Sequence, residues 1–469
     1  MKPSRSNLLL LLPAVWLLAL TVPHLDQGDF RRDTGRYAAM GLYMWSGGSL
    51  LQPHLNPETP YFNKPPLGFW IHGAVLKLFG VSLPVARAPS ILAALGVVCL
   101  SLLTARRIGT HSEALVSGLV LALSYDFFRR TREISLDFWQ LFFLMATVYL
   151  VVSAAKLERK DLLLVAGVPL GLALLCKPLV ALGSVPILLI WLWLLGKSSL
   201  WKWLVFGSVP LALLVALPWH FYMWSQFGDR FTNQYFREET INRARGLMTS
   251  GPPHYYLKIL ATGYWPWLLA VAYAVYVWLL SAKPKRNKAR DLLLFGATWV
   301  LFTLLLLSLF PGKQVNYALP LYPMLSWIAA AGLCRIPWRP LHQWYRHNFV
   351  GAGMAAVLVF LVVSLAPIKV QKPPDKEWTA LFNWLDRQPS EPQSIAQQNL
   401  ESDDVCYFYV KRGRWLLNAN ANAGANAAYT EKPWDLLLTK VSTTQRIANE
   451  SIVFQSGQLV LRRRLPADR

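Results

Sequence analysis

DTGRY at residues 33–37 and YFNKPPLGFW at residues 61–70 belong to one segment between two hydrophobic stretches, each long enough to cross a bilayer. A segment in that position is predicted to lie at a membrane surface. It combines the carboxylate of Asp33 with several cations and with a rigid Pro-Pro turn that has aromatic neighbours. Because such groups can hold a lipid phosphate and bring an acid or base to it, the segment is predicted to form half of an active site.

The composition is that of an integral membrane protein. Of the 469 residues, 54% are hydrophobic and 15% are charged, whereas soluble domains carry about 25% charged residues. The residues before 367 hold 33 Lys and Arg against 14 Asp and Glu, and the remaining tail holds 14 against 11. A basic membrane part suits anionic headgroups or phosphorylated ligands. A nucleic-acid partner is disfavoured, because the cations are scattered among the hydrophobic stretches.

Windows of about 20 apolar residues predict an α-helical polytopic membrane protein of about 11–13 transmembrane helices. The first stretch resembles a signal peptide but lacks a small-x-small cleavage site, so it is predicted to remain as a helix. Only Lys177-Pro178 separates two of the stretches, which form either a tight hairpin or one broken helix. The eleven predicted spans lie near residues 7–23, 88–105, 113–127, 137–155, 161–176, 179–196, 203–222, 262–281, 291–309, 317–333 and 348–366.

The distribution of basic residues predicts a cytoplasmic N-terminus and a C-terminal tail on the opposite side. The short loops assigned to the cytoplasm hold 17 Lys and Arg, and the longer outer loops hold 16. The density of basic residues, rather than their number, favours this orientation. An anionic ligand on the outer face would explain the cations there, which are Arg36, Lys64, Arg129, Arg130, Arg132, Arg243, Arg245 and Lys313.

Two parts of the chain are predicted, a membrane catalytic domain over residues 1–366 and a small soluble α/β domain over residues 367–469. The first has long external loops near 24–87 and 223–261, and two helices along the membrane interface are expected in the first loop. These helices are Arg36–Trp45 and Phe69–Phe79. In the tail, Glu377–Leu385 is predicted as a helix, Val405–Val410 and Ser451–Leu461 as strands, and Asn418–Ala428 as an exposed loop.

Individual motifs on the outer face each have a functional and an ordinary interpretation. The Pro-Pro pair fixes the backbone after Lys64 and aims one cation suited to a phosphate, although a lysine that snorkels to the interface has the same pattern. Asp33 is either a base or electrostatic partner beside a membrane-embedded site or an ordinary carboxylate in a surface loop, and its sequence favours neither. Asp137 lies at the mouth of a span, where acids are functional by default, but a helix-anchoring pair with Arg132 would also place it there.

The second outer loop and a later turn carry further polar residues. The cluster of Glu238, Glu239, Asn242 and Arg243 suits an anionic sugar lipid or a solvated helix face. A lone histidine such as His254 is more often structural than a metal ligand. Lys313, with the Asn316-Tyr317 pair, lies at another outer helix end, where ordinary turn chemistry is the alternative. The four cysteines show no metal-ligand spacing and are assigned no chemistry.

The two opening motifs resemble the first external loop of GT-C-class transferases that use polyprenyl-phosphate sugars. This class includes the bacterial lipid A aminoarabinose transferases and the protein O-mannosyltransferase-like family. The similarity spans roughly residues 25–330 in this sequence. Other stretches that look like the family pattern, in the same order, are Arg132…Asp137, Pro218-Trp219, Glu239-x-Ile241-x-Arg243, Pro266-Trp267 and Gly312-Lys313…Tyr317…Pro320.

The resemblance implies sugar transfer from an undecaprenyl-type phosphate carrier on the periplasmic face of the bacterial inner membrane, to a lipid A-like lipid, a glycan or a protein. It implies that Asp33 and Asp137 are the active-site carboxylates and that Lys64, Arg243 and Lys313 hold the carrier phosphate. The same resemblance places a further set of residues around the substrate. These are Arg36, Tyr37, Arg132, Tyr317 and His254.

The chain departs from the aminoarabinose transferases at Asn63, where those proteins have an acidic residue before the Lys-Pro-Pro lysine. No cofactor and no metal ligands are therefore predicted, and a divalent metal stays an open alternative. The tail is also shorter, so acceptor recognition is expected to differ.

The chemistry expected of these groups needs no nucleotide. A lipid phosphate is a good leaving group once cations neutralise its growing charge, and a carboxylate then removes or orients the acceptor's proton. The alternative is a transporter or flippase of lipid-linked sugars, in which the same cations bind headgroups without chemistry. Inverted repeats would favour transport, and none is visible in the sequence. A membrane scaffold that presents the tail domain leaves the Lys-Pro-Pro segment unexplained.

Overall fold

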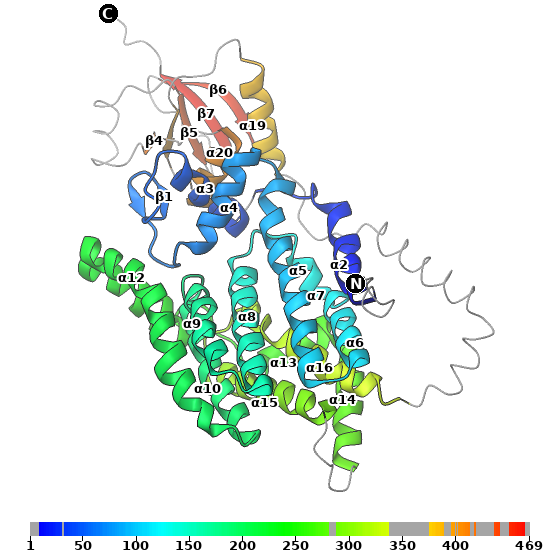
Figure 1. The fold of residues 1–469 in the computed structure, drawn as a ribbon. Helices are drawn as coiled ribbons and strands as arrows, with labels where there is room; N and C mark the ends of the chain where they lie inside the picture. Colours follow the sequence, from blue (N-terminus) through cyan, green and yellow to red (C-terminus); the bar gives the residue numbers. More distant parts are fainter. Residues whose placement is uncertain are drawn as a thin grey trace, which may run out of the picture. The chain divides into compact units, whose positions relative to one another are not determined.

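A computed structural model describes residues 9–30, 32–280, 288–336, 375–388, 395–398, 400, 402–412, 417–418, 436–440 and 450–464. The chain divides into two compact units (Figure 1). The first comprises Met1–Leu25, Phe62–Ile71 and Arg87–Ile368, and the second comprises Asp26–Tyr61, His72–Ala86 and Lys369–Arg469. The predicted span at 348–366 and most of the predicted loop at 418–428 lie outside the described residues.

The first unit is helical, and its helices occupy the positions of the other ten predicted spans. Some of the packed helix pairs are neighbours in sequence, such as α8 with α9 and α15 with α16, and others are not, such as α9 with α12 and α14 with α16. The main helices of this unit are α2 (Leu12–Thr21), α5 (Leu83–Ile108), α6 (His111–Ala122), α7 (Tyr125–Arg130), α8 (Leu136–Leu157), α9 (Lys160–Leu174), α10 (Pro178–Leu194), α12 (Val209–Thr232), α13 (Tyr255–Gly263), α14 (Trp265–Leu280), α15 (Lys288–Leu309) and α16 (Leu321–Leu333).

The apolar helices identify a multi-pass membrane protein. Among the described residues, four helices are long and apolar enough to cross a membrane, or five if the bent pair α13 and α14 forms one span. The four are Leu83–Ile108, Leu136–Leu157, the 45-residue run Ser198–Asn242 and Arg290–Leu309. Several shorter apolar helices accompany them, so the full number of spans stays a prediction.

Local sequence signals explain where the helices near the centre of this unit begin and end. Thr110 and Glu113 form a capping box at the start of α6, with bonds of 3.2 and 2.8 Å. Pro178 begins α10, and a residue before proline is driven out of the helical region. Lys177 accordingly has an extended backbone with φ at −164°. The stretches on either side of Lys177-Pro178 are therefore two separate helices rather than one.

The segment expected as the second external loop is helical through Asn242. Helix α12 continues past the predicted span, bends at Gly228, and passes into the π-helix η5 (Asn233–Asn242). Gly228 has φ at 47° and ψ at −126°, which an L side chain rarely adopts. Phe231, Tyr235 and Glu239 are all buried. This buried face stabilises a helix whose polar composition had indicated a loop.

The second unit contains a five-stranded mixed sheet with the order β4-β3-β5-β7-β6. Strands β3, β4 and β5 are parallel, and β7 pairs antiparallel with β5 and β6. Other elements of this unit are α3 and the short hairpin β1–β2. The bounds are α3 (Arg32–Trp45), β1 (His54–Asn56), β2 (Thr59–Pro60), α4 (Leu67–Phe79, of which His72–Phe79 belongs here), α19 (Lys376–Asp386), β3 (Ile395–Gln398), α20 (Ser402–Arg412), β4 (Leu417–Asn418), β5 (Leu436–Lys440), β6 (Glu450–Ser456) and β7 (Leu459–Arg464).

The structure confirms the predicted helices of this unit, divides one predicted strand into two and replaces the other by a helix. Glu377–Leu385 lies within α19, and Ser451–Leu461 falls in the two strands β6 and β7, which turn at Gly457. The prediction of a strand at Val405–Val410 is wrong, because these residues belong to helix α20 and are all buried. A short, fully buried apolar run has no periodicity that separates helix from strand. The two helices predicted in the first loop are present as α3 and α4, and their position at the interface stays a prediction.

Candidate functional site

The segment that carries Lys64 is fixed on both sides. Before it, the Phe62 ring is fully buried and packs against Phe227 and Phe231, with ring centroids 4.9 and 5.9 Å apart. After it, the Leu67 amide donates to the Leu175 carbonyl oxygen at 3.3 Å. The two prolines between them restrict the backbone further. Lys64 is therefore held on a rigid segment, as the sequence predicts.

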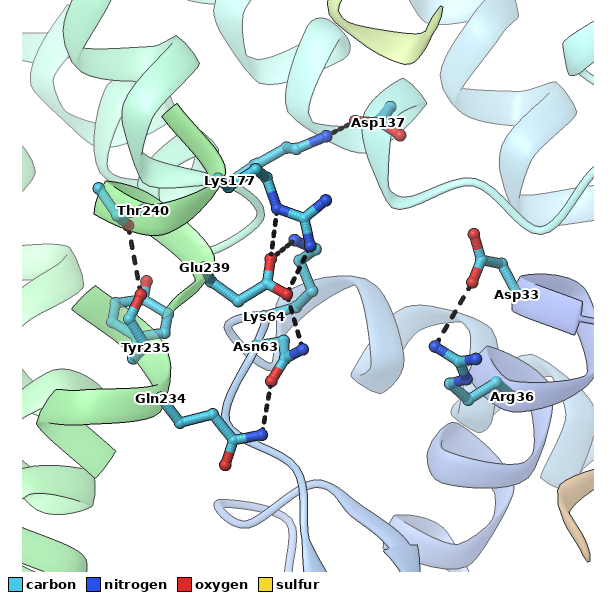
Figure 2. Close-up of polar contacts among 11 residues, drawn as sticks. Asp33, Arg36, Asn63, Lys64, Asp137, Lys177, Gln234, Tyr235, Glu239 and Thr240 are labelled. Carbon is cyan, nitrogen blue, oxygen red and sulfur yellow. Dashed lines mark hydrogen bonds and ion pairs between the residues drawn. The ribbon is translucent and has the colours of Figure 1, made fainter. Parts of the chain in front are cut away.

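The carboxylate of Glu239 is the centre of a dense set of polar contacts. Lys64 Nζ donates to Oε2 at 3.1 Å, and Asn63 Nδ2 donates to Oε1 at 2.7 Å (Figure 2). Arg243 donates from Nε to Oε2 at 3.1 Å and from Nη2 to Oε1 at 2.6 Å. Each carboxylate oxygen thus accepts two hydrogen bonds, which matches its full accepting capacity. Lys64, Arg243 and Asn63 thus form a cradle that holds the Glu239 carboxylate by both of its oxygens.

The π-helix η5 places both Gln234 and Glu239 within reach of Asn63. In a π-helix, residues five apart are joined by backbone hydrogen bonds and so lie on one face. Gln234 and Glu239 are five apart, and both reach Asn63: Gln234 Nε2 donates to Asn63 Oδ1 at 2.9 Å. Arg243 follows Glu239 by one α-helical turn. At ten residues η5 is longer than the single-turn π-bulges that are common in proteins.

A second ion pair, Lys177 with Asp137, lies in the first, helical unit. Lys177 Nζ donates to Asp137 Oδ1 at 2.6 Å, and Asn316 Nδ2 donates to Asp137 Oδ2 at 3.1 Å. The Lys177 ammonium also lies 4.9 Å from the centroid of the Tyr317 ring. Arg130 donates to Asn316 Oδ1, which fixes the orientation of that amide. Asp137 is therefore held on both of its oxygens.

The two sets of contacts act electrostatically as one group, here called the anion cluster and defined as Lys64, Asp137, Lys177, Glu239 and Arg243. Burial lowers the pKa of Lys64, and the charges of Lys177 and Arg243 lower it further, against the opposing effect of Glu239. For Lys177, burial lowers the pKa, but the Asp137 carboxylate and Tyr317 outweigh it and raise the pKa overall. With three cations and two carboxylates, the anion cluster carries a surplus positive charge. A bound anion would neutralise that surplus.

The structure brings four of the predicted site residues together: Lys64, Arg243, Asp137 and Tyr317. The ordinary interpretation of Asp137 as a partner of Arg132 is wrong, because Asp137 pairs with Lys177. Lys177 was not predicted as a site residue, and Glu239 was predicted only as a member of a polar cluster. For Lys177 the available signal was a lysine-proline pair between two spans, and for Glu239 it was the i,i+4 spacing to Arg243.

Three predicted residues of the same unit make other contacts. Lys313 Nζ donates to the carbonyl oxygens of Leu307 at 2.5 Å and Phe310 at 2.6 Å, so it caps the C-terminal end of α15. Arg132 is buried and donates to the Leu20 carbonyl oxygen. His254 is exposed just before α13. Their roles in phosphate or substrate binding stay predictions.

Asp33, Arg36 and Tyr37 lie on α3 in the second unit. The Asp33 carboxylate is 66% exposed and forms an ion pair of 3.7 Å with Arg36. An exposed carboxylate is accessible to a ligand, and its catalytic role stays a prediction. The part of the chain that the structure describes contains no group of three or more His, Cys, Asp or Glu side chains placed to hold a metal ion.

Gly312 holds the backbone that carries Arg243. A Cβ atom built at Gly312 would lie 1.7 Å from the Arg243 carbonyl oxygen, and the Gly312 amide donates to the Ala244 carbonyl oxygen at 3.2 Å. Gly312→Ala is therefore expected to push the Arg243 segment away and to lower stability by about 1–3 kcal/mol. Thermal unfolding of the purified variant measures this. Gly183→Ala serves as the control, because a Cβ atom there would lie 4.0 Å from its nearest neighbour. Equal stability of the two variants would contradict the proposed close approach.

Comparison with solved structures defines the fold class. The chain resembles the crystal structure of ArnT from Cupriavidus metallidurans bound to undecaprenyl phosphate, with a TM-score of 0.69, 18% identity and 98% coverage of both chains. It also resembles the oligosaccharyltransferase AglB from Archaeoglobus fulgidus in complex with an inhibitory peptide and a dolichol-phosphate, with a TM-score of 0.58, 12% identity, and coverage of 93% of this chain and 69% of that chain. These likenesses confirm the predicted GT-C-type fold.

The amino-acid sequence also resembles a family of glycosyltransferases and individual arabinosyl transferases. A family model described as dolichyl-phosphate-mannose-protein mannosyltransferase matches residues 63–224, which include the Lys-Pro-Pro segment and Asp137. An undecaprenyl phosphate-alpha-4-amino-4-deoxy-L-arabinose arabinosyl transferase of Shewanella sediminis is 27% identical over 71% of this chain. A second, from Pseudomonas fluorescens, is 29% identical over 66%. The alignments cover 61% and 56% of these relatives' own lengths. The predicted resemblance to aminoarabinose transferases is thus confirmed.

Proposed function

We propose that the chain is an integral-membrane glycosyltransferase that moves a sugar from a polyprenyl phosphate carrier to a lipid, glycan or protein acceptor. The anion cluster carries this proposal: three cations face two carboxylates on rigid segments, which leaves one positive charge for a phosphate. The names of the relatives support it, since they are arabinosyl transferases that act on an undecaprenyl phosphate sugar. The ArnT structure, which binds undecaprenyl phosphate, supports the identity of the carrier.

The reaction follows from these groups. An acceptor oxygen attacks the anomeric carbon of the sugar, and the bond between that carbon and the phosphate oxygen breaks. The electron pair leaves with the polyprenyl phosphate, whose added charge is neutralised by Lys64 and Arg243. The acceptor's proton passes to a carboxylate, for which Asp33 is the proposed base and Asp137 the supporting group. Where the acceptor is itself a phosphate, it has no proton to lose, and the carboxylates orient it.

The same proposal includes the placement in the cell. The chain lies in the bacterial inner membrane with a cytoplasmic N-terminus, and the C-terminal residues lie on the periplasmic face. Transfer takes place at that face, where α3 and α4 lie along the membrane interface. The remaining predicted residues surround the substrate in this proposal. They are Arg36, Tyr37, Arg132, Tyr317 and His254, while Lys313 is proposed as a third residue for the carrier phosphate.

Mass spectrometry of lipids and envelope glycans from cells with and without the gene tests the proposal. Loss of the gene is expected to cause a polyprenyl-phosphate sugar to accumulate and the matching sugar to disappear from one acceptor. Cells carrying Asp33→Ala are expected to show the same pattern. A build-up of glycolipid in the cytoplasmic leaflet, with Asp33→Ala behaving as wild type, would contradict sugar transfer and indicate transport.

A further inference from the structure

The Glu239 side chain is less exposed to solvent than the side chains of the two cations that bind it, Lys64 and Arg243. Its side chain is 5% exposed, whereas the side chain of Lys64 is 18% exposed and that of Arg243 is 14% exposed. Lys177, the third cation, is also 14% exposed. Lys64 and Arg243 therefore keep more solvent-accessible side-chain surface than the carboxylate that they hold. Glu239 can then influence a ligand of these cations by its charge without touching it.

The contacts of Glu239 also hold it in place. Besides the two cations, the neutral amide of Asn63 binds it, and Gln234 in turn fixes that amide through a bond of 2.9 Å. The Lys64 ammonium has three donors, and the carboxylate accepts one of them, so a phosphate can bind Lys64 while Glu239 stays. Displacing Glu239 would instead leave a buried carboxylate without its cations, which is costly.

We propose that Glu239 makes the anion cluster discriminate between the substrate and the product of the proposed reaction. It sets the charge of the cluster to match the singly charged phosphodiester of the sugar donor, and it repels the doubly charged phosphomonoester that remains after transfer. Glu239 therefore promotes release of the polyprenyl phosphate product. The inference rests on the proposed function, because it takes the polyprenyl phosphate as the leaving group.

The charges support this inference. The anion cluster contains three cations, Lys64, Lys177 and Arg243. It also contains two carboxylates, Asp137 and Glu239, so its net charge is +1. A phosphodiester has a single ionisable proton and carries one negative charge at neutral pH, which completes the balance. A phosphomonoester carries about −1.5 to −2 at pH 7, because its second pKa is about 6. The excess negative charge then lies beside a buried carboxylate, where screening is weak.

The test uses the purified full-length protein and two lipid probes that differ in charge and by one methyl group. Polyprenyl phosphate is the monoester, and its methyl ester is the diester. The dissociation constant of each probe is measured by microscale thermophoresis in detergent at pH 7.5 and at pH 5.5. At pH 7.5, Glu239→Gln is expected to strengthen monoester binding about tenfold relative to diester binding. At pH 5.5 the monoester is mostly singly charged, so this gain is expected to shrink.

Two further variants separate charge from shape. Glu238→Gln makes the same chemical change at the neighbouring exposed position and is expected to leave both constants unchanged. Glu239→Asp keeps the charge but shortens the side chain, and it is expected to keep the wild-type ratio of the two constants. If Glu239→Asp changes the ratio as much as Glu239→Gln does, shape rather than charge is responsible, and the inference is wrong.

The remaining outcomes are equally decisive. An unchanged ratio in Glu239→Gln would overturn the inference, and so would an equal strengthening of both lipids, which would make Glu239 a simple competitor for the cations. Lys64→Ala tests the underlying proposal in the same assay. If Lys64→Ala weakens neither lipid, the phosphate site itself is refuted. If it weakens both while the Glu239→Gln ratio is unchanged, only the product-release role is refuted.

Discussion

Replacing Lys64 by alanine is expected to lower the rate of sugar transfer by about 100-fold or more and to leave the amount of protein in the membrane unchanged. Removing one preorganised donor that stabilises developing charge typically costs a factor of about 100–1,000. Here the lost ammonium is the cation on the rigid Lys-Pro-Pro segment. Its partner Glu239 keeps Arg243 and Asn63, so the protein is expected to fold.

The measurement is transfer of labelled sugar by membranes that contain equal amounts of each variant, as quantified by immunoblot. Lys77→Ala is a suitable control, because it makes the same substitution at an exposed position of α4. It is expected to behave as wild type. Normal transfer by Lys64→Ala would remove Lys64 from any role with the phosphate.

Replacing Asp137 by alanine is expected to affect both activity and stability. The Lys177 and Asp137 side chains are 14% and 16% exposed, so the variant leaves a largely buried ammonium without its carboxylate. Breaking a fully buried pair costs about 3–5 kcal/mol. Since this pair keeps some solvent contact, a loss of about 2 kcal/mol is expected. Transfer is expected to fall about 100-fold or more, because Lys177 would also lose its orientation.

A double variant, Asp137→Ala with Lys177→Met, distinguishes the two effects. Removing both charges is expected to restore most of the stability, which thermal unfolding in detergent measures, and to leave transfer low. Arg159→Met with Asp161→Ala removes an exposed pair of the same type and is the matched control. Recovery of transfer in the Asp137–Lys177 double variant would show that the pair has only a structural role.

Much of this arrangement follows from the sequence. In a bilayer the backbone must satisfy its own hydrogen bonds, so long apolar stretches predict helices reliably. Ten of the predicted spans coincide with helices. Lys64 and Arg243 were predicted as site residues because they are basic residues on the predicted outer face, where the positive-inside rule does not expect them and an anionic ligand would explain them. The contact between them through Glu239 depends on tertiary packing between segments about 175 residues apart, which no local sequence pattern indicates.

The missed features have physical reasons. The π-helix η5 departs from the 3.6-residue period on which helix prediction depends, so nothing indicated that Gln234 and Glu239 share a face. Lys177 looked like part of a turn because Pro178 follows it, although that proline is what holds Lys177 in an extended backbone. In the tail, Val405–Val410 is rich in aromatic and branched residues, which favour strands. The structure places it inside a longer helix, Ser402–Arg412, which packs against α3, and a six-residue apolar run alone does not reveal that longer helix.

The most direct test of sugar transfer is made with purified components. The protein is reconstituted in lipid nanodiscs and incubated with a polyprenyl-phosphate sugar fraction and with envelope membranes as acceptor, and the release of free polyprenyl phosphate is followed by mass spectrometry. The wild type is expected to release polyprenyl phosphate in step with sugar gained by the acceptor, and Lys64→Ala is expected to release almost none. Binding of the lipid sugar with no release of polyprenyl phosphate by the wild type would contradict the account.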